Sequence, residues 1–576
     1  MRRSSLLVFF VLGFFSLLAQ TVVIREFIIS FGGNELGIGL FYFSWLFWVG
    51  LGALAAAGRF GGVSVKNFLR LLFLYPVLAV GEVFLFILLR PIAGVSGWEF
   101  FSLQKAVFYI FIFSALFSFF TGFLFTLGAV WARKISGINI NGADSPGDST
   151  RLIARVYAYE ALGSFCAGIA VTFLIINLVP PLTILFGAGA IFSSAVLIVA
   201  SRLKDKFAAG LQAVLLAVLL VGCAMGSRLA DFQQYARVSM LMPRAKILET
   251  VYTPYQHLVV SQLPGQKIIL SDGEVISGIP EYADADRESA LLFSQAYFPS
   301  RVLLIGTAAE NLIHSLLKFP LEQITYCVQD KDYYQQVYAA LPVDWQKEFS
   351  SSRVKVVFSS GRAFAGAVNE KFDLVVVCAP DPSSLWANSL FTREFYSAVA
   401  GILSDKGILA TRIRGGENFL GKESADYGSS VYYTLKKVFP ELVIVPGDNV
   451  WFFAGRDNSG ITEDAAVLGG RLEKVRPENF SFSGQNFSVL LNSGRVGFAR
   501  KAYRDNPFFK NSGLINTDAD PLVFFLNLLV LASYDALLPA DFFKNAILTR
   551  GLIFFIPLVM FFFFRAGFLK KSAQPQ

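Results

Sequence analysis

The sequence of 576 residues is poor in charge, in cysteine and in histidine. Charged residues make up 16% of it, whereas a soluble globular protein usually carries about 25%. Four cysteines are too few for a disulfide scaffold. The two histidines form no His/Cys cluster with metal-ligand spacing, so no metal site is predicted. The net charge of +8 does not indicate a nucleic-acid partner, because much of it lies in short loops between apolar runs.

The chain is rich in long apolar runs, and 54% of its residues are hydrophobic. A run of roughly 20 apolar residues is long enough to cross ~30 Å of hydrocarbon. We predict seven spans in a membrane domain over 1–228 and an eighth near 546–564, in a C-terminal helix over 546–566. The seven lie near 5–24, 37–57, 69–89, 106–131, 156–178, 181–200 and 208–226. The first run lacks a clear cleavage site and is interpreted as an uncleaved helix.

Basic residues in the short loops predict the orientation in the membrane. With the N-terminus in the cytoplasm, the inner loops hold fifteen Lys and Arg, in 2–3, 59–70, 133–155, 202–206 and 565–571. The outer loops hold three, namely Arg25, Arg90 and Lys105. This bias predicts a multi-pass protein of the cell (inner) membrane with both termini cytoplasmic and its large extramembrane part facing outward. Basic residues just after the seventh run count against this orientation, and a re-entrant segment would reverse it: they are Arg228, Arg237, Arg244 and Lys246.

Two carboxyl groups fall inside the predicted spans. Glu82 lies within the third span and Glu160 near the start of the fifth. Ionisable groups are costly in hydrocarbon and by default suggest a proton or cation site. The structural alternative is a carboxyl group bonded to a neighbouring helix or reaching water, and no larger set of charged residues marks a transport path.

The pattern of apolar and polar residues changes twice along the extramembrane part. Residues 240–280 alternate as short strands around the turn pair Pro264-Gly265, which predicts a small β-domain. Over 281–460, wholly apolar strands alternate with helices, which predicts a mostly parallel α/β sheet of the Rossmann-like type. A partly helical appendage follows over 461–545. Ligands of such sheets bind beyond the carboxyl ends of the strands, where the site is expected.

Several motifs in this part resemble the spermidine synthases. They are Thr253-Pro-Tyr-Gln256-His-Leu-Val-Val260, Ser271-Asp272-Gly273-Glu274, Val302-Leu-Leu-Ile-Gly306, Phe372-Asp-Leu-Val-Val-Val-Cys378-Ala-Pro-Asp381-Pro382 and Phe391-Thr-Arg-Glu-Phe-Tyr396. The resemblance implies a small β-domain before a class I methyltransferase-like domain. It also implies transfer of an aminopropyl group from decarboxylated S-adenosylmethionine to a diamine. Motifs at Arg25-Glu26, Arg155–Gly163 and Asn516-Thr-Asp518 resemble bacterial forms of this family that are fused to membrane spans.

Most positions to which the resemblance assigns chemistry are altered. The glycine-rich loop keeps Gly306 but reads Thr307-Ala308-Ala309-Glu310 after it, with Ala309 at the position of the family's acid. The ribose-binding Glu is replaced by Val328, the adenine-region acid by Ser360 and the catalytic Asp by Cys378. Cys378 has no His nearby in sequence, which disfavours a new nucleophile. Vestigial cofactor positions are Gly306, Glu310 and Asp330, and retained substrate positions are Gln256, Asp272, Glu288 and Asp381. Asp381 is also the retained catalytic candidate.

These losses predict a membrane-tethered, non-catalytic relative that acts by binding or assembly, with no cofactor. Its predicted partners are the lipid bilayer and either a polyamine or a protein, without nucleic acid. One alternative is an active aminopropyltransferase, or a related S-adenosylmethionine-type transferase, with a remodelled site that uses decarboxylated S-adenosylmethionine. Another is a transporter with a polyamine-sensing domain. Fold alone does not choose among them.

Overall fold

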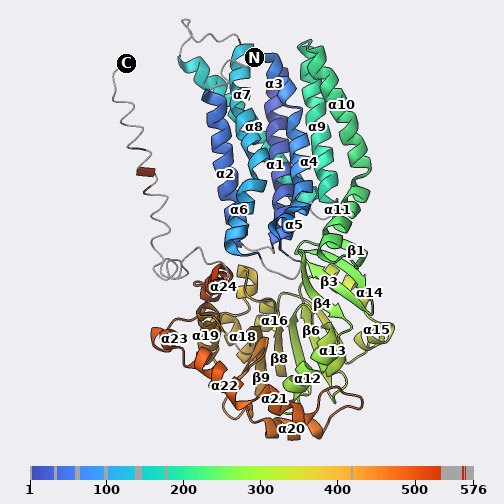
Figure 1. Cartoon of the computed structure of the whole chain (residues 1–576), viewed down its shortest axis with the longest axis vertical. Helices are drawn as coiled ribbons and strands as arrows, with labels where there is room; N and C mark the ends of the chain where they lie inside the picture. Colours follow the sequence, from blue (N-terminus) through green and yellow to red (C-terminus); the bar gives the residue numbers. More distant parts are fainter. Residues whose placement is uncertain are drawn as a thin grey trace. The chain divides into compact units, whose positions relative to one another are not determined.

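The computed structural model describes residues 3–31, 35–58, 65–95, 101–136, 146–175, 179–416 and 420–533, together with residues 559, 561, 562 and 565. The chain divides into two compact units. The first comprises Met1–Phe101, Lys105–Glu281 and Asp330–Val343, and the second comprises Ser102–Gln104, Tyr282–Gln329 and Asp344–Gln576. Figure 1 labels most of the elements of the two units.

Apolar helices make up most of the first unit (Figure 1). They are α1 (Arg3–Phe31), α2 (Glu35–Gly58), α3 (Val65–Leu71), α4 (Leu74–Ile87), α5 (Leu89–Ala93), α6 (Leu103–Phe113), α7 (Ala115–Ile135), α8 (Pro146–Ala170) with a π-helical end (Val171–Ile175), α9 (Pro181–Arg202), α10 (Lys206–Ala224) and α11 (Gly226–Leu241).

Seven helical stretches among the described residues are long and apolar enough to cross a membrane. They are Leu6–Phe31, Gly37–Ala57, Asn67–Ile87, Ala115–Ile135, Thr150–Phe173, Pro181–Arg202 and Lys206–Ala224. Each overlaps one of the seven predicted runs. The eighth predicted run, 546–564, falls almost entirely outside the described residues.

Paired glycines bring two pairs of these helices into backbone contact. A methyl group on Gly13 of α1 would lie 2.0 Å from the carbonyl oxygen of Glu160 in α8, and one on Gly163 of α8 would lie 1.9 Å from that of Phe10. Gly52 of α2 and Gly122 of α7 are related in the same way, each against a backbone oxygen of the other helix. Small residues at such crossings let helices pack closely where no hydrophobic force drives them together.

Helix α11 is an element that the sequence did not predict. Its buried face has helical spacing but includes Gln233, Gln234 and Arg237 beside Ala230 and Val238. An apolar stripe is the signal by which an amphipathic helix is recognised, and polar residues interrupt it here. Further differences are short breaks between α3 and α4 and between α6 and α7, within the third and fourth predicted spans.

The first unit also contains a four-stranded antiparallel sheet in the order β1-β2-β3-β4. Its strands are β1 (Lys246–Tyr252), β2 (His257–Leu263), β3 (Gln266–Ser271) and β4 (Glu274–Ile279). The predicted turn at Pro264-Gly265 joins β2 to β3, and Gly265 has a φ of +78° that suits glycine. Helix α14 (Lys331–Ala340) belongs to the same unit, and Lys267 Nζ donates to its Ala340 carbonyl at 2.8 Å.

A seven-stranded sheet forms the centre of the second unit, in the order β10-β11-β9-β8-β5-β6-β7. Its strands are β5 (Arg301–Gly306), β6 (Gln323–Val328), β7 (Val354–Phe358), β8 (Phe372–Cys378), β9 (Leu403–Arg414), β10 (Glu441–Val445) and β11 (Asn449–Gly455). Strands β5 to β9 pair in parallel, whereas β11 is antiparallel to both β9 and β10. This order, with a single reversed strand, is that of the predicted methyltransferase-like fold, which is confirmed.

Helices accompany this sheet and fill the appendage (Figure 1). They are α12 (Ala283–Gln295), α13 (Glu310–Leu316), α15 (Val343–Phe349), α16 (Gly361–Ala367), α17 (Leu385–Asn388), α18 (Arg393–Ile402), α19 (Lys422–Lys436), α20 (Ala465–Glu473), α21 (Phe487–Leu490), α22 (Ser493–Ala499), α23 (Pro507–Ser512) and α24 (Leu522–Ser533). Leu522, Val523 and Leu526 of α24 share a core with Leu303 and Val375 of the sheet, so the appendage completes the second unit.

We expect the strand core of the second unit to carry much of its stability. Leu304 lies in the central strand β5 and is fully buried. Leu304→Ala removes buried methyl groups and leaves a cavity, so it should lower the free energy of unfolding by roughly 2–5 kcal/mol. Chemical unfolding of the detergent-purified chain measures this. Leu385→Ala is the matched control, because Leu385 is exposed. Equal losses in the two variants would show that β5 is misplaced.

Candidate functional site

The carboxyl edge of the seven-stranded sheet brings together three strand ends. Gly306 of β5 pairs with Cys378 of β8, and Val377 of β8 pairs with Thr411 of β9. Cys378 and Arg412, the next residues along β8 and β9, therefore lie side by side. The predicted catalytic position thus stands at the centre of the edge where parallel sheets bind ligands.

The loop after β5 has kept a glycine only where the backbone requires one. Gly306 has a φ of +125°, and a methyl group on it would lie 2.1 Å from the Cys378 carbonyl oxygen. The Thr307 amide donates to that same oxygen at 3.0 Å. Ala308 has a φ of +57°, a conformation that glycine adopts without strain and alanine does not. The loop therefore keeps a glycine-like conformation at Ala308, where the resemblance implies the third glycine.

Apolar side chains occupy positions where the resemblance implies carboxylates. Ala309 and Val328 are both fully buried. Glu310, one residue after the lost acid, is also buried, and its Oε1 accepts a hydrogen bond from Tyr326 Oη at 3.0 Å. Ser360 caps helix α16, where its Oγ accepts from the Ala363 amide at 3.2 Å. Glu310 and Ser360 thus make contacts within the unit.

Cys378 is buried, and it is not disulfide-bonded. Burial raises the pKa of its thiol to about 12. At neutral pH the group is an uncharged thiol, which neither accepts a proton nor acts as a nucleophile, since both roles need the thiolate. An uncharged thiol thus stands where the resemblance implies a carboxylate.

Arg412, a residue that the sequence did not single out, faces this edge. Its Nη1 donates to Glu288 Oε1 of α12, and its guanidinium lies 5.3 Å from the ring centroid of Trp451. Burial alone would lower the pKa of Arg412, but the charge of Glu288, its hydrogen bond to Arg412 and the charge of Asp381 raise it. A basic residue near the end of an otherwise buried strand was the signal that could have identified it.

Asp381 is also held by groups of its own unit. Its Oδ1 accepts from the Arg414 amide at 2.8 Å and from Tyr427 Oη at 3.1 Å, and Arg414 Nε lies 3.7 Å from Oδ2. Burial and then the Asp381 charge raise the pKa of Tyr427, so this tyrosine stays a neutral donor. The structure thus places Glu288, Cys378 and Asp381 around Arg412, with both carboxylates already paired.

In the first unit, Gln256 and Asp330 bind each other. Asp330 Oδ2 accepts from Gln256 Nε2 at 2.9 Å and from Thr253 Oγ1 at 2.7 Å, while its Oδ1 caps α14. Gln256 Oε1 accepts from Ser271 Oγ at 2.6 Å. These two predicted ligand-binding residues therefore link the small sheet to α14.

Asp272 occupies the turn between β3 and β4, where its Oδ1 accepts from the His257 amide at 2.9 Å. Burial raises the pKa of Asp272 to about 6 despite this bond and the nearby Arg25 charge. Burial, helped by the Arg237 and Arg25 charges, also holds the pKa of His257 well below its usual value. The imidazole is therefore neutral, and it packs against Tyr252 with ring centroids 4.4 Å apart.

Asp286 is a second residue that the sequence did not single out. It accepts from Ser315 Oγ at 2.6 Å, from Lys318 Nζ at 2.9 Å, and from both the amide and the hydroxyl of Ser481. Burial alone would raise the pKa of Asp286, but these donors hold it below its ordinary value. Asp286 ties α12 to the appendage, so its role is structural.

Buried polar groups also lie within the helices of the first unit. Glu82 is buried, and its carboxylate oxygens have no hydrogen-bond partner among the described residues. Glu160 is half-buried on α8. A fully buried Glu26 accepts from Gln233 Nε2 at 2.8 Å and from Arg237 Nη2 at 2.5 Å. The described residues contain no group of three or more His, Cys, Asp or Glu that could hold a metal ion.

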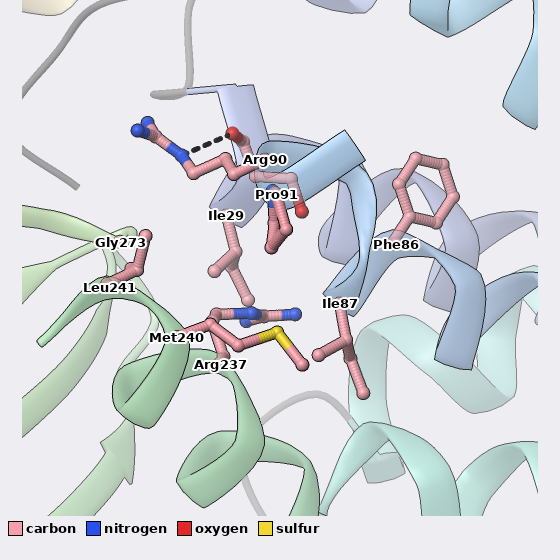
Figure 2. Close-up of a pocket in the computed structure, with 10 residues that line it drawn as sticks. Ile29, Phe86, Ile87, Arg90, Pro91, Arg237, Met240, Leu241 and Gly273 are labelled. Carbon is pink, nitrogen blue, oxygen red and sulfur yellow. Dashed lines mark hydrogen bonds between the residues drawn. The ribbon is translucent and has the colours of Figure 1, made fainter. Parts of the chain in front are cut away.

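The Arg237 side chain borders a hollow of about 300 Å³, counting the open space at its mouth. Figure 2 shows its guanidinium between Ile29 and Met240, with Ile87 beside it. The dashed line marks the Arg90 Nε bond to the Ser30 carbonyl, at 3.2 Å. Both arginines are thus engaged within the unit, and most of the lining is apolar.

Comparison with known proteins identifies the α/β part. Residues 288–446 match the model of the spermine/spermidine synthase domain. The chain carries a spermine/spermidine synthase domain. A polyamine aminopropyltransferase of Pseudomonas syringae pv. tomato is 27% identical to this chain, over 32% of the chain and 66% of that relative. One from Nitrosomonas europaea is 26% identical over 32% and 55%, and one from Korarchaeum cryptofilum is 31% identical over 20% and 36%.

The chain spans 36% to 66% of the length of these curated relatives. Among solved structures, it is similar to a spermidine synthase in complex with the transition-state analogue AdoDATO, at 17% identity and a TM-score of 0.37. That similarity covers 45% of this chain and 88% of that one. Spermidine synthase from Thermotoga maritima is similar at 17% identity and a TM-score of 0.36, over 45% and 87%.

The residues of this spermidine synthase domain do not fit decarboxylated S-adenosylmethionine. The resemblance assigns a carboxylate that binds both ribose hydroxyls to the position of Val328, which is apolar and buried. Losing the acceptor leaves buried hydroxyls unpaired at a cost of about 1–3 kcal/mol each. At the position of the family's loop acid, this chain has the buried Ala309. No reaction step is therefore assigned to this nucleoside.

We predict that Asp272→Asn changes the pH dependence of stability. The folded-state pKa of about 6 exceeds the ordinary 3.8, so ionising Asp272 at neutral pH costs roughly 1–3 kcal/mol, a cost that disappears as the pH falls from 6 to 4. Asparagine keeps the acceptor oxygen, carries no charge and tolerates the φ of +46°. The variant should melt higher than the wild type at pH 8 and equally at pH 4.

The control for this comparison is Asp284→Asn, at an exposed carboxylate paired with Arg287. It should leave the difference between the two pH values unchanged. A wild type that is more stable than Asp272→Asn at pH 8 would show that the Asp272 carboxylate is stabilising, contrary to this expectation.

Proposed function

We propose that this chain is a membrane-tethered spermidine synthase-like protein that does not transfer aminopropyl groups and acts by binding or assembly. The observation that carries the proposal is the neutral, buried thiol of Cys378 at the position of the family's base. The paired state of Glu288 and Asp381 supports it. Retained polar residues serve the fold, while Ala309 and Val328, which stand where acids would hold the nucleoside, are apolar.

The chemistry of aminopropyl transfer makes the loss of a base decisive. An amine nitrogen attacks the propyl carbon bound to the sulfonium, the carbon–sulfur bond breaks, and the electron pair leaves with the thioether. The attacking ammonium must first lose a proton, and a positioned base contributes about 10²–10⁴-fold to such steps. Cys378 holds its own proton at neutral pH, and nearby Glu288 is bound to Arg412.

Membrane tethering rests on the seven apolar helices and on the bias of basic residues in the short loops. The same bias favours an outward-facing synthase-like domain with both termini in the cytoplasm. An outward domain has no obvious supply of a cytosolic nucleoside, which agrees with a non-catalytic role. The domain then presents a folded surface outside the cell membrane, suited to a polyamine or a protein partner.

A transporter with a polyamine-sensing domain is the second candidate function. The buried carboxyl of Glu82, whose oxygens lack a hydrogen-bond partner among the described residues, favours it. An ionisable group of this kind inside a span suggests a proton or cation site. Uptake of labelled putrescine into vesicles that is lost in Glu82→Gln would support this candidate.

We predict no spermidine formation from putrescine and decarboxylated S-adenosylmethionine by the detergent-purified full chain. Without a positioned base, the rate should fall at least about 10²–10⁴-fold below that of a soluble aminopropyltransferase in the same detergent. Mass spectrometry of the products measures this. Cys378→Ser is the matched control and should also be inactive. Spermidine formation that is abolished by Asp381→Asn would contradict the proposal.

For the orientation, we predict that a reporter active only outside the cytoplasm gives signal when fused near Gly447 and none at Gln576. The reason is the excess of basic residues on the predicted inner side. A cytoplasm-specific reporter at the same positions serves as the control and should give the opposite pattern. Signal from the Gln576 fusion alone would reverse the orientation and favour a cytoplasmic transferase.

A further inference from the structure

Around Arg412, the second unit presents the groups that proteins use to recognise organic cations. Glu288 supplies a carboxylate, Trp451 supplies an aromatic face, and Asp381 adds a second negative charge. A cation over a tryptophan face is attracted by the ring's negative face, and aromatic faces are used in this way for organic ammonium ligands. Charge-assisted hydrogen bonds to a carboxylate are about twice as strong as neutral ones.

The strand register explains how these groups converge. Arg412 of β9 pairs directly with Trp451 of β11, so their side chains lie on the same face of the sheet. Cys378 lies beside Arg412 on the neighbouring strand β8. Helix α12 brings Glu288 to this face. Backbone pairing and helix packing thus position the groups of this site.

The site is filled by Arg412 itself. The side chains of Arg412 and Glu288 are 27% and 14% exposed, whereas Trp451 is buried beneath the guanidinium. The guanidinium already has the carboxylate and the aromatic face that an incoming cation would need. Asp381 holds the Arg414 amide and Tyr427. An added diamine would have to displace a covalently attached competitor.

We infer that Arg412 is an internal ligand, which fills a site for organic ammonium or guanidinium ions formed by Glu288, Trp451 and Asp381. This inference deepens the proposed non-catalytic function and rests on it. Because the competitor is tethered, its effective concentration far exceeds that of a free amine. Arg412 thus determines specificity: the wild-type domain does not respond to polyamines, and of the two partners proposed above this leaves the protein. Removing the guanidinium exposes the cation site.

The experiment is a calorimetric titration of the full chain in detergent with putrescine and, separately, with methylguanidinium. Arg412→Ala should bind putrescine at least tenfold more tightly than the wild type, because Glu288 and Trp451 are left without a cation. Arg412→Lys is the matched control: it keeps the tethered charge and should bind no better than the wild type. Methylguanidinium should raise the melting temperature of Arg412→Ala more than that of the wild type.

A second substitution assigns the binding to this site. Glu288→Gln combined with Arg412→Ala should abolish the gained affinity for putrescine. The double variant lacks the Glu288 carboxylate that would bind the ammonium group of putrescine. Should Arg412→Ala fail to fold, Arg412→Gln, which keeps more of the side-chain volume, takes its place in the same titration. Folding of each variant is checked by its unfolding transition before titration.

Three results would overturn the inference. They are a folded Arg412→Ala that binds putrescine no more tightly than the wild type, a wild type that binds it as tightly as the variant, and a gained affinity that persists in the double variant. Amine binding by the wild type without turnover would show that Arg412 is not an internal ligand, and it would leave the proposed non-catalytic function standing. Spermidine formation by the wild type would instead contradict the proposed function, whatever fills the cation site.

Discussion

A carboxylate that is buried on folding needs a hydrogen-bond or ion-pair partner, and this requirement determines the contacts at the carboxyl edge of the synthase-like sheet. Glu288 is bound by Arg412, Asp381 by Arg414 and Tyr427, and Glu310 by Tyr326. Each partner belongs to the same unit as the carboxylate it binds. Glu288 and Asp381 are thereby neutralised by groups of the fold itself, so the folded state does not require a substrate to neutralise them.

The remaining support for the fold does not involve the altered positions. The strand core around Leu303 and Val375 extends without interruption to α24, and the Gly306 contact with the Cys378 backbone depends on the main chain rather than on the thiol. Two polar contacts also join the appendage to the rest of the second unit: Arg362 pairs with Asp518, and Asn516 donates to the Phe391 carbonyl. The motifs Asn516-Thr-Asp518 and Phe391–Tyr396 of the family resemblance therefore stabilise the fold independently of catalysis.

Periodic features could be predicted from the sequence, whereas partners distant in the sequence could not. The seven apolar runs and the buried strands follow from hydrophobic patterns, which local composition carries. Helix α11 was missed because Gln233, Gln234 and Arg237 interrupt its buried face. The altered positions at Val328 and Cys378 could be recognised from the motifs. The role of Arg412 could not, because its contact with Glu288 joins residues 124 positions apart and depends on strand register.

The central claim is that the domain keeps the fold of the spermidine synthases without their nucleoside site. Direct calorimetric titration of the purified full chain with decarboxylated S-adenosylmethionine tests it. Without the ribose carboxylate, two charge-assisted hydrogen bonds are lost, about 3 kcal/mol or more, which weakens binding on the order of a hundredfold. The account predicts no saturable heat at micromolar nucleoside. Saturable micromolar binding that is lost when Gly306 is replaced by a larger residue, in protein that remains folded, would contradict it.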